Sequence, residues 1–120
     1  MKLREVLGET PLQFTLLQKL LQKGEQVTFD WMEYHNDYTR WHSGYLDDII
    51  HTASPAGSNF PETFLIWYKV PLAATLDKPA SFRKENVRVN RLKFDRMQLY
   101  KHEGRWFFGN RKPGSDDEAS

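Results

Sequence analysis

Two aromatic side chains near the C-terminus, Tyr100 and Phe107, stand among basic residues in a pattern suited to nucleic acid. If the segments 96–102 and 105–108 pair as an antiparallel hairpin, the two rings lie directly opposite each other on one face. Aromatic rings stack on bases of any sequence, and arginine neutralises phosphate and stacks as well. The predicted binding face comprises Arg83, Lys84, Arg88, Lys93, Arg96, Tyr100, His102, Arg105, Phe107 and Arg111.

The positive charge of the chain is concentrated in the same region. Residues 82–112 contain ten Lys or Arg and three Asp or Glu, a net charge of +7, whereas residues 1–81 carry a net charge of −3. Such a block suits nucleic acid, with single strands favoured because their bases are accessible, or an acidic protein surface. One alternative is that the basic side chains only solvate one face of a sheet. Another is that the two rings pack beneath the N-terminal helix.

Complete catalytic motifs are absent from the sequence. It has no G-x-S-x-G elbow, no H-E-x-x-H pair, no G-x-G-x-x-G loop, and no cysteine that could act as nucleophile or zinc ligand. One arrangement worth testing is ribonuclease-like, with His102 acting beside Arg96, Arg105 and Glu103. The expectation is a protein that is more a binder than an enzyme and that needs no cofactor.

Two smaller groups of residues could hold a metal ion or tune a histidine. Glu33, His35 and Asp37 would share one face of a straight strand, but a turn after His35 competes with this arrangement. Asp47 and His51 have the i, i+4 spacing of two ligands on a helix, which is also the spacing of ordinary surface pairs. Both groups supply too few ligands, so we expect no metal site.

A helix near the N-terminus is the clearest local element. Thr10, Pro11 and Gln13 match an N-cap, a first-turn proline and the glutamine of a capping box. A stripe of leucines follows, and Gly24 is a typical end of a helix. The spacing predicts a helix over 11–23 whose leucines pack on the sheet of the domain.

Alternating apolar and polar residues predict that a sheet begins at Val27. A two-residue turn at Asn36–Asp37 would set the register of the first hairpin. Its predicted cross-strand pairs are Glu33 with Arg40 and Met32 with Trp41.

The spacing of apolar residues predicts a short helix over 43–51, which would bury Tyr45, Leu46, Ile49 and Ile50. Residues 63–70 are apolar on both sides, as in a central strand, and Pro71 is expected to end it. Further sheet segments are predicted over 82–89, 91–94, 96–102 and 105–108, with bulges or tight turns where the apolar phase slips. In the last hairpin, the core face carries Met97, Leu99, Trp106 and Phe108.

These elements predict one α+β domain over residues 1–112, with an N-terminal amphipathic helix packed on a mostly antiparallel sheet of about five or six strands. Residues 113–120 are expected to form a disordered acidic tail. The lack of cysteine and of long apolar runs predicts a small, soluble, cytoplasmic protein with no membrane partner. We expect a non-catalytic module that binds nucleic acid. The alternatives are an inhibitor or adaptor that docks an acidic protein partner, and a small ribonuclease-like enzyme.

Overall fold

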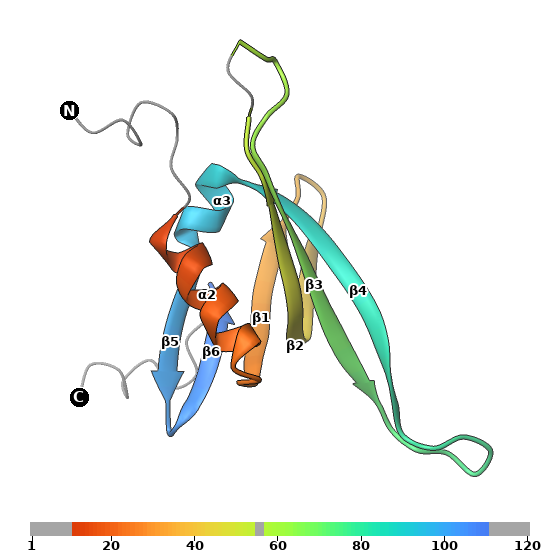
Figure 1. Ribbon diagram of the computed structural model, residues 1–120. Coiled ribbons are helices and arrows are strands. Elements are labelled where there is room, and N and C mark those ends of the chain that lie inside the picture. The colour runs from red at the N-terminus through yellow and green to blue at the C-terminus, as the bar shows by residue number, and fades with distance from the viewer. Residues whose placement is uncertain (1–10, 55–56, 111–120) are drawn as a thin grey trace.

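The computed structural model describes residues 11–54 and 57–110, which form two helices and one six-stranded sheet (Figure 1). In chain order the elements are α2 (Leu12–Gln22), β1 (Val27–Tyr34), β2 (Thr39–Thr52), β3 (Thr63–Leu72), β4 (Ser81–Asn90), α3 (Arg91–Arg96), β5 (Gln98–His102) and β6 (Arg105–Gly109). The strands lie in the order β4-β3-β2-β1-β6-β5, and all neighbours are antiparallel except β1 and β6. The predicted α+β fold is confirmed. The tail predicted over 113–120 lies outside the described ranges.

Both helices lie on the same face of the sheet, which we call the helix face. Phe14 of α2 and Phe94 of α3 each approach Phe64 of β3, with ring centroids 6.1 and 4.0 Å apart. Leu17 of α2 and Phe29 of β1 are fully buried between the helices and the sheet. The opposite face has no described helix over it, and we call it the open face.

Residues 43–51, predicted as a short helix, belong instead to β2, a strand of 14 residues. The register with β3 slips by one residue between Leu46 and Asp48, which is a β-bulge. Because of this extra residue, Leu46 and Ile49 both point to the helix face although they are three positions apart. That spacing imitates a helical repeat, and the prediction was wrong for this reason.

The segment 91–94, predicted as part of the sheet, begins helix α3 instead. The side-chain oxygen of Asn90 accepts a hydrogen bond from the Lys93 N–H at 2.8 Å and caps the helix. Phe94 is fully buried against Phe64. The alternation of apolar and polar residues is therefore interrupted around this segment by a short helix and not by a bulge.

The prediction that Pro71 ends the central strand was wrong. β3 continues past Pro71, which pairs with Phe82 of β4. What stops near Pro71 is the ladder to β2, whose last pair on that side is Tyr45 with Lys69. Proline has no N–H to offer the next strand, so it ends one of the two ladders and leaves the other intact.

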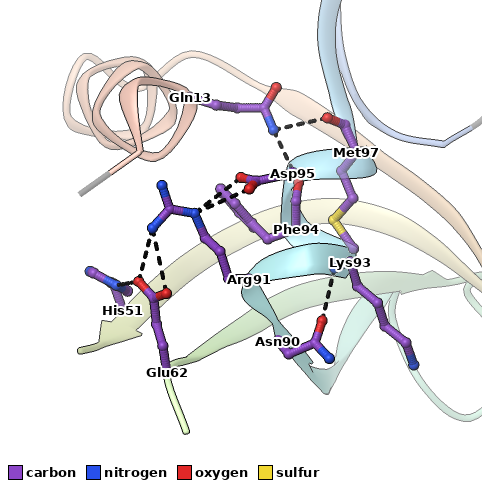
Figure 2. Close-up of polar contacts among 9 residues, drawn as sticks. All are labelled: Gln13, His51, Glu62, Asn90, Arg91, Lys93, Phe94, Asp95 and Met97. Atoms are coloured by element: carbon purple, nitrogen blue, oxygen red, sulfur yellow. Dashed lines mark hydrogen bonds and ion pairs between the residues drawn. The ribbon is translucent and has the colours of Figure 1, made fainter. Parts of the chain in front are cut away.

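Gln13 does not close a capping box. Pro11 is the N-cap and makes no side-chain cap bond, and Thr10 lies outside the described residues. Instead the Gln13 amide reaches the segment between α3 and β5 (Figure 2). Its Nε2 donates to the carbonyl oxygens of Met97 and Phe94, at 2.9 and 3.4 Å. Its Oε1 accepts a hydrogen bond from the Leu99 N–H at 3.2 Å, so one side chain joins α2 to the C-terminal hairpin.

A polar cluster around Arg91 fixes the other side of α3 (Figure 2). Arg91 Nη1 lies 3.2 Å from Glu62 Oε2, and Arg91 Nε lies 3.2 Å from Asp95 Oδ2. Glu62 also accepts a hydrogen bond from His51 Nε2 at 2.6 Å. The cluster links the end of β2, the loop before β3 and α3.

Replacing Gln13 by alanine is expected to destabilise the protein by about 2 kcal/mol, because the Met97 carbonyl and the Leu99 N–H lose the partner that Gln13 gives them. The Phe94 carbonyl keeps its hydrogen bond from the Met97 N–H. The matched control is Gln18→Ala on the same helix, which removes only one bond, to the Ile49 carbonyl, and should cost about 1 kcal/mol. Urea unfolding of both variants measures the difference. Equal losses would contradict the role given to Gln13.

Candidate binding face

One row of paired residues crosses all six strands on the open face. Tyr100 of β5 pairs with Phe107 of β6, as predicted, and Phe107 pairs in turn with Thr28 of β1. In spatial order the row consists of Tyr100, Phe107, Thr28, Tyr45, Lys69 and Lys84. Paired residues point to the same face of a sheet. The row therefore carries rings toward one edge and lysines toward the other.

The rings of Tyr100 and Phe107 are stacked, with centroids 5.5 Å apart and 14° between their planes. Both side chains are half-buried, and both lie on the open face, away from α2 and α3. Their strand neighbours Leu99 and Phe108 point to the core, as the predicted alternation requires. The alternative that the two rings pack beneath the N-terminal helix therefore does not hold.

Tyr45 belongs to the same face, although it lies in the segment 43–51 that was predicted to be a helix. It borders a hollow of about 540 Å³ that forms where β3 leaves β2. The hollow is lined by Thr28, Ser43, Gly44, Tyr45, Val70, Pro71, Arg105 and Phe107. Two rings and one guanidinium thus meet at one depression. Strand alternation of Trp41, Ser43 and Tyr45 is the signal that could have found Tyr45.

Arg105 and Arg88 are the exposed arginines of this face. Within residues 11–54 and 57–110, no carboxylate lies at ion-pair distance from either guanidinium. Arg105 stands at the ring end of the row and Arg88 on the edge strand β4. Both charges are available to an anionic ligand.

The lysine end of the row is partly neutralised. Asp47, at the bulge of β2, lies 3.8 Å from Lys69 Nζ and 3.7 Å from Lys84 Nζ. Lys69 Nζ also lies over the ring of Phe82, 5.3 Å from its centroid. The three charged groups leave a net charge of +1 at this end. Asp30 and Asp48 also lie on the open face, so Arg88 and Arg105 are its positive groups with no carboxylate at ion-pair distance among the described residues.

The other predicted residues are distributed over different parts of the molecule. Arg83 points to the helix-face side of β4, where its Nε lies 2.7 Å from Glu85 Oε2. Lys93 and Arg96 lie on α3 and border a second hollow of about 350 Å³, which is also lined by Trp31, Met32, Tyr34 and Asn110. Arg111 lies outside the described residues. The ten predicted residues do not form one continuous patch.

The four residues of the ribonuclease-like arrangement are not gathered. His102 ends β5, with Nε2 3.8 Å from Glu103 Oε2. Arg96 precedes the start of that strand, so the length of β5, about 16 Å, lies between Arg96 and His102 (Figure 1). An acid–base pair for phosphodiester cleavage would need its members within hydrogen-bond reach of one substrate.

The second metal candidate is also divided between faces. Asp47 interacts with lysines of the open face, whereas His51 lies on the helix face, bound to Glu62. In the part of the chain that the structure describes, no group of three or more histidine or acidic side chains could hold a metal ion.

A buried network surrounds the first candidate group instead. His42 is only 1% exposed and approaches the rings of Trp31 and Phe29, with ring centroids 5.7 and 6.5 Å away. Its Nε2 lies 3.1 Å from Glu33 Oε1, and its Nδ1 lies 2.7 Å from the Tyr68 hydroxyl. Since a carboxylate only accepts, Nε2 carries the hydrogen of the first bond and Nδ1 accepts from Tyr68. Both ring nitrogens are satisfied, which is the usual state of a buried structural histidine.

The pKa values at the two ends of this network shift in opposite directions. Burial alone would raise the pKa of Glu33, but hydrogen bonds from His42 and His35, with the electrostatic interaction of both rings, lower the pKa below its usual 4.5. Burial raises the pKa of Tyr68, and the negative charge of Glu85 adds to this. Tyr68 therefore keeps its proton and donates it in the hydrogen bond to His42, so the network stabilises the fold and offers no activated group.

Because the pKa of Glu33 is lower in the folded state, its ionisation stabilises the fold above pH 4.5, and this contribution is lost as the pH falls through the lowered value. Glu33→Gln should therefore flatten the decline of unfolding free energy below pH 4.5. Urea unfolding between neutral and acidic pH measures this, with Glu103→Gln as the exposed control. A variant curve parallel to the wild-type curve would disprove the assignment.

Comparisons with protein-family models, curated proteins and solved structures find no match to this chain. No helix among the described residues is long and apolar enough to cross a membrane.

Proposed function

We propose that the open face binds single-stranded nucleic acid and that the protein is a non-catalytic binding module. The observation that carries the proposal is the hollow where Arg105 meets the rings of Tyr45 and Phe107. A base can stack on a ring while a neighbouring phosphate approaches the guanidinium. The partner ring of Tyr100 extends the same surface.

The geometry of the rings supports single strands over duplexes. Tyr100 and Phe107 are half-buried within the sheet surface, so neither ring projects far enough to enter a groove. Stacking on them requires a base whose face is already accessible, as in a single strand. The row spans five strand spacings, about 24 Å, which is room for several extended nucleotides.

Phosphate contacts would come from both ends of the row. Arg105 serves the ring end, and Arg88 with Lys84 serves the edge strand. Asp47 reduces the charge near Lys84, so we expect about three effective phosphate contacts and a salt slope of about −2. A role of this kind, in a chain without cysteine, suits the cytoplasm.

Exposed apolar groups on the same face favour an acidic protein as the second candidate partner. Ile50 is 47% exposed, and Leu65 and Trp67 are half-buried beside it. Trp41, which is 40% exposed, pairs with Met32 nearer the start of β2. Aromatic and arginine side chains are the usual anchors of protein interfaces. An inhibitor or adaptor would use these groups together with the arginines of the open face.

Arg105→Gln should weaken the binding of oligothymidine and oligouridine strands of about 15 nucleotides. The slope of log affinity against log salt concentration should become less negative by about 0.7, because one phosphate contact is lost. Tyr45→Ala should lower the affinity at least about fivefold, because a stacked base contributes roughly 1–3 kcal/mol. Fluorescence anisotropy at several salt concentrations measures both effects.

The matched control is Lys101→Gln, which removes the same charge from the opposite face of the same hairpin. It should leave affinity nearly unchanged. Equal effects of Lys101→Gln and Arg105→Gln, or no binding at low salt, would refute the proposed site. A protein partner that persists after nuclease treatment would favour the second candidate.

A further inference from the structure

The sheet ends in a long strand with one exposed edge. β4 spans ten residues and pairs only with β3 within the described parts of the chain, whereas the opposite edge strand, β5, has five residues. Side chains along the outer part of β4, such as Phe82 and Lys84, are exposed to solvent. Proteins usually shorten or cover such an edge, because its backbone groups can pair with another chain.

The register fixes which backbone groups of β4 point outward. In an antiparallel ladder, alternate residues hydrogen-bond to a given neighbour. The His35 N–H donates to the Tyr38 carbonyl at 2.8 Å, and this bond fixes which residues of β2 hydrogen-bond to β1. Tyr45 is not one of them, so its backbone groups face Lys69 of β3. The backbone groups of Lys69 therefore face β2, and those of its other partner, Lys84, face away from β3. The groups that face away from β3 are then those of Phe82, Lys84, Asn86 and Arg88.

The position of Pro71 is consistent with this alternation of hydrogen bonds. It lies opposite Phe82, and a residue without an N–H fits a position that makes no hydrogen bond to β4. The outward residues thus present a regular series of donors and acceptors, about 6.8 Å apart along the strand. None of these four residues has another recorded partner for its backbone groups within the described chain.

The charge along the edge selects the kind of strand that fits. Arg83, Lys84 and Arg88 outnumber Glu85, which gives β4 a net charge of +2. Lys84 and Arg88 lie on the open face, four positions apart, with Phe82 beyond Lys84. An incoming strand gains most from carboxylates at the same spacing and an apolar residue opposite Phe82.

A second copy of this chain fits the edge less well than an acidic strand. If β4 of two copies paired in antiparallel fashion, a twofold axis would pass through one residue of each strand. That residue must lie near the middle of β4 if most of the strand is to be paired. Centring on Lys84 or on Glu85 places that residue opposite its own copy. Centring on Asn86 places Lys84 opposite Arg88. Each of these three registers sets like charges directly against each other, which is destabilising. Centring on Val87 avoids this, but it places Lys84 opposite Asn90 and Arg88 opposite Asn86, so neither positive charge faces a carboxylate.

We propose that the outer edge of β4 accepts an extended, acidic peptide strand from a partner protein. The strand adds to the sheet as a seventh member, with backbone hydrogen bonds for affinity and carboxylates opposite Lys84 and Arg88 for selectivity. This site is the edge backbone and not the ring-lined hollow, so the inference goes beyond nucleic-acid binding and does not rest on it.

The test uses the full chain, labelled with nitrogen-15, and a designed peptide as probe. The probe is acetyl-Glu-Val-Thr-Thr-Glu-Thr-Val-amide, which places its glutamates opposite Arg88 and Lys84 in antiparallel register, and its control carries lysine at both positions. Hydrogen exchange of the Lys84, Asn86 and Arg88 amides should slow at least about tenfold with the acidic peptide only.

Asn86→Pro and Asn86→Ala separate the backbone from the side chain. The proline removes an outward N–H without touching the ladder to β3, a place where edge strands tolerate proline, and should weaken peptide binding at least about tenfold. Asn86→Ala should stay within about twofold of the wild type. Oligonucleotide affinity should be the same in both variants, so each proposal can fail separately.

Three results would overturn the edge site. They are amides that remain unprotected at millimolar peptide, equal protection by the lysine control, and unchanged peptide binding in Asn86→Pro. Protection of the same amides by an oligonucleotide and not by the peptide would also overturn it, because the edge would then be part of the nucleic-acid surface.

Discussion

The close crossing of β2 and β3 at Gly44 is the constraint on which the rest of the structure depends. A Cβ atom at this position would lie 2.4 Å from the carbonyl oxygen of Lys69, so only glycine leaves room for the neighbouring backbone. Just beyond it, the bulge after Leu46 redirects the strand. The first half of β2 can then pair with β1 while the second half pairs with β3.

This bend brings rings from distant strands together beneath two short helices. Phe29 of β1 lies 5.2 Å from Tyr68 of β3 and 6.1 Å from Phe108 of β6, measured between ring centroids. Phe94 of α3 closes the cluster on Phe64. Because α2 and α3 are both needed to cover this face, the chain has no described helix left for the other. The open face is therefore a consequence of how the core is closed.

The hairpins could be predicted from the sequence because their signals are local. Opposite charges at Glu33 and Arg40, and the tight turn at Glu103–Gly104, specify one register each, and both registers are confirmed. Both turn residues have positive φ, 50° and 78°, as a two-residue hairpin loop requires. Alternation then placed Tyr100 and Phe107 correctly on one face.

The missed features all depend on contacts between segments far apart in the chain. The bulge in β2 moves Leu46 and Ile49 to the same face, and only the crossing with β3 explains why it is there. Gln13 has the spacing of a capping residue but bonds to a segment more than 80 positions away. Tyr45 joined the binding face only once β2 was known to be a strand. Local periodicity cannot distinguish these cases.

The two proposed ligands would act against each other through shared charges. Lys84 belongs to the row on the open face, and Arg88 lies on the same face beside it. Both residues also belong to the edge that would receive an acidic strand. Carboxylates placed beside them would remove much of the positive potential at one end of the nucleic-acid surface, while Arg105 and the rings at the other end would stay accessible.

Such a coupling is reciprocal, because a ligand that weakens a second one is itself weakened by the same factor. It would also be sensitive to salt, since the shared term is electrostatic and the groups are exposed. The rings contribute stacking that salt does not screen. Nucleic acid would therefore lose its phosphate contacts to a bound acidic strand before it lost its stacked bases, and the partner strand would act by loosening the nucleic acid at the β4 end.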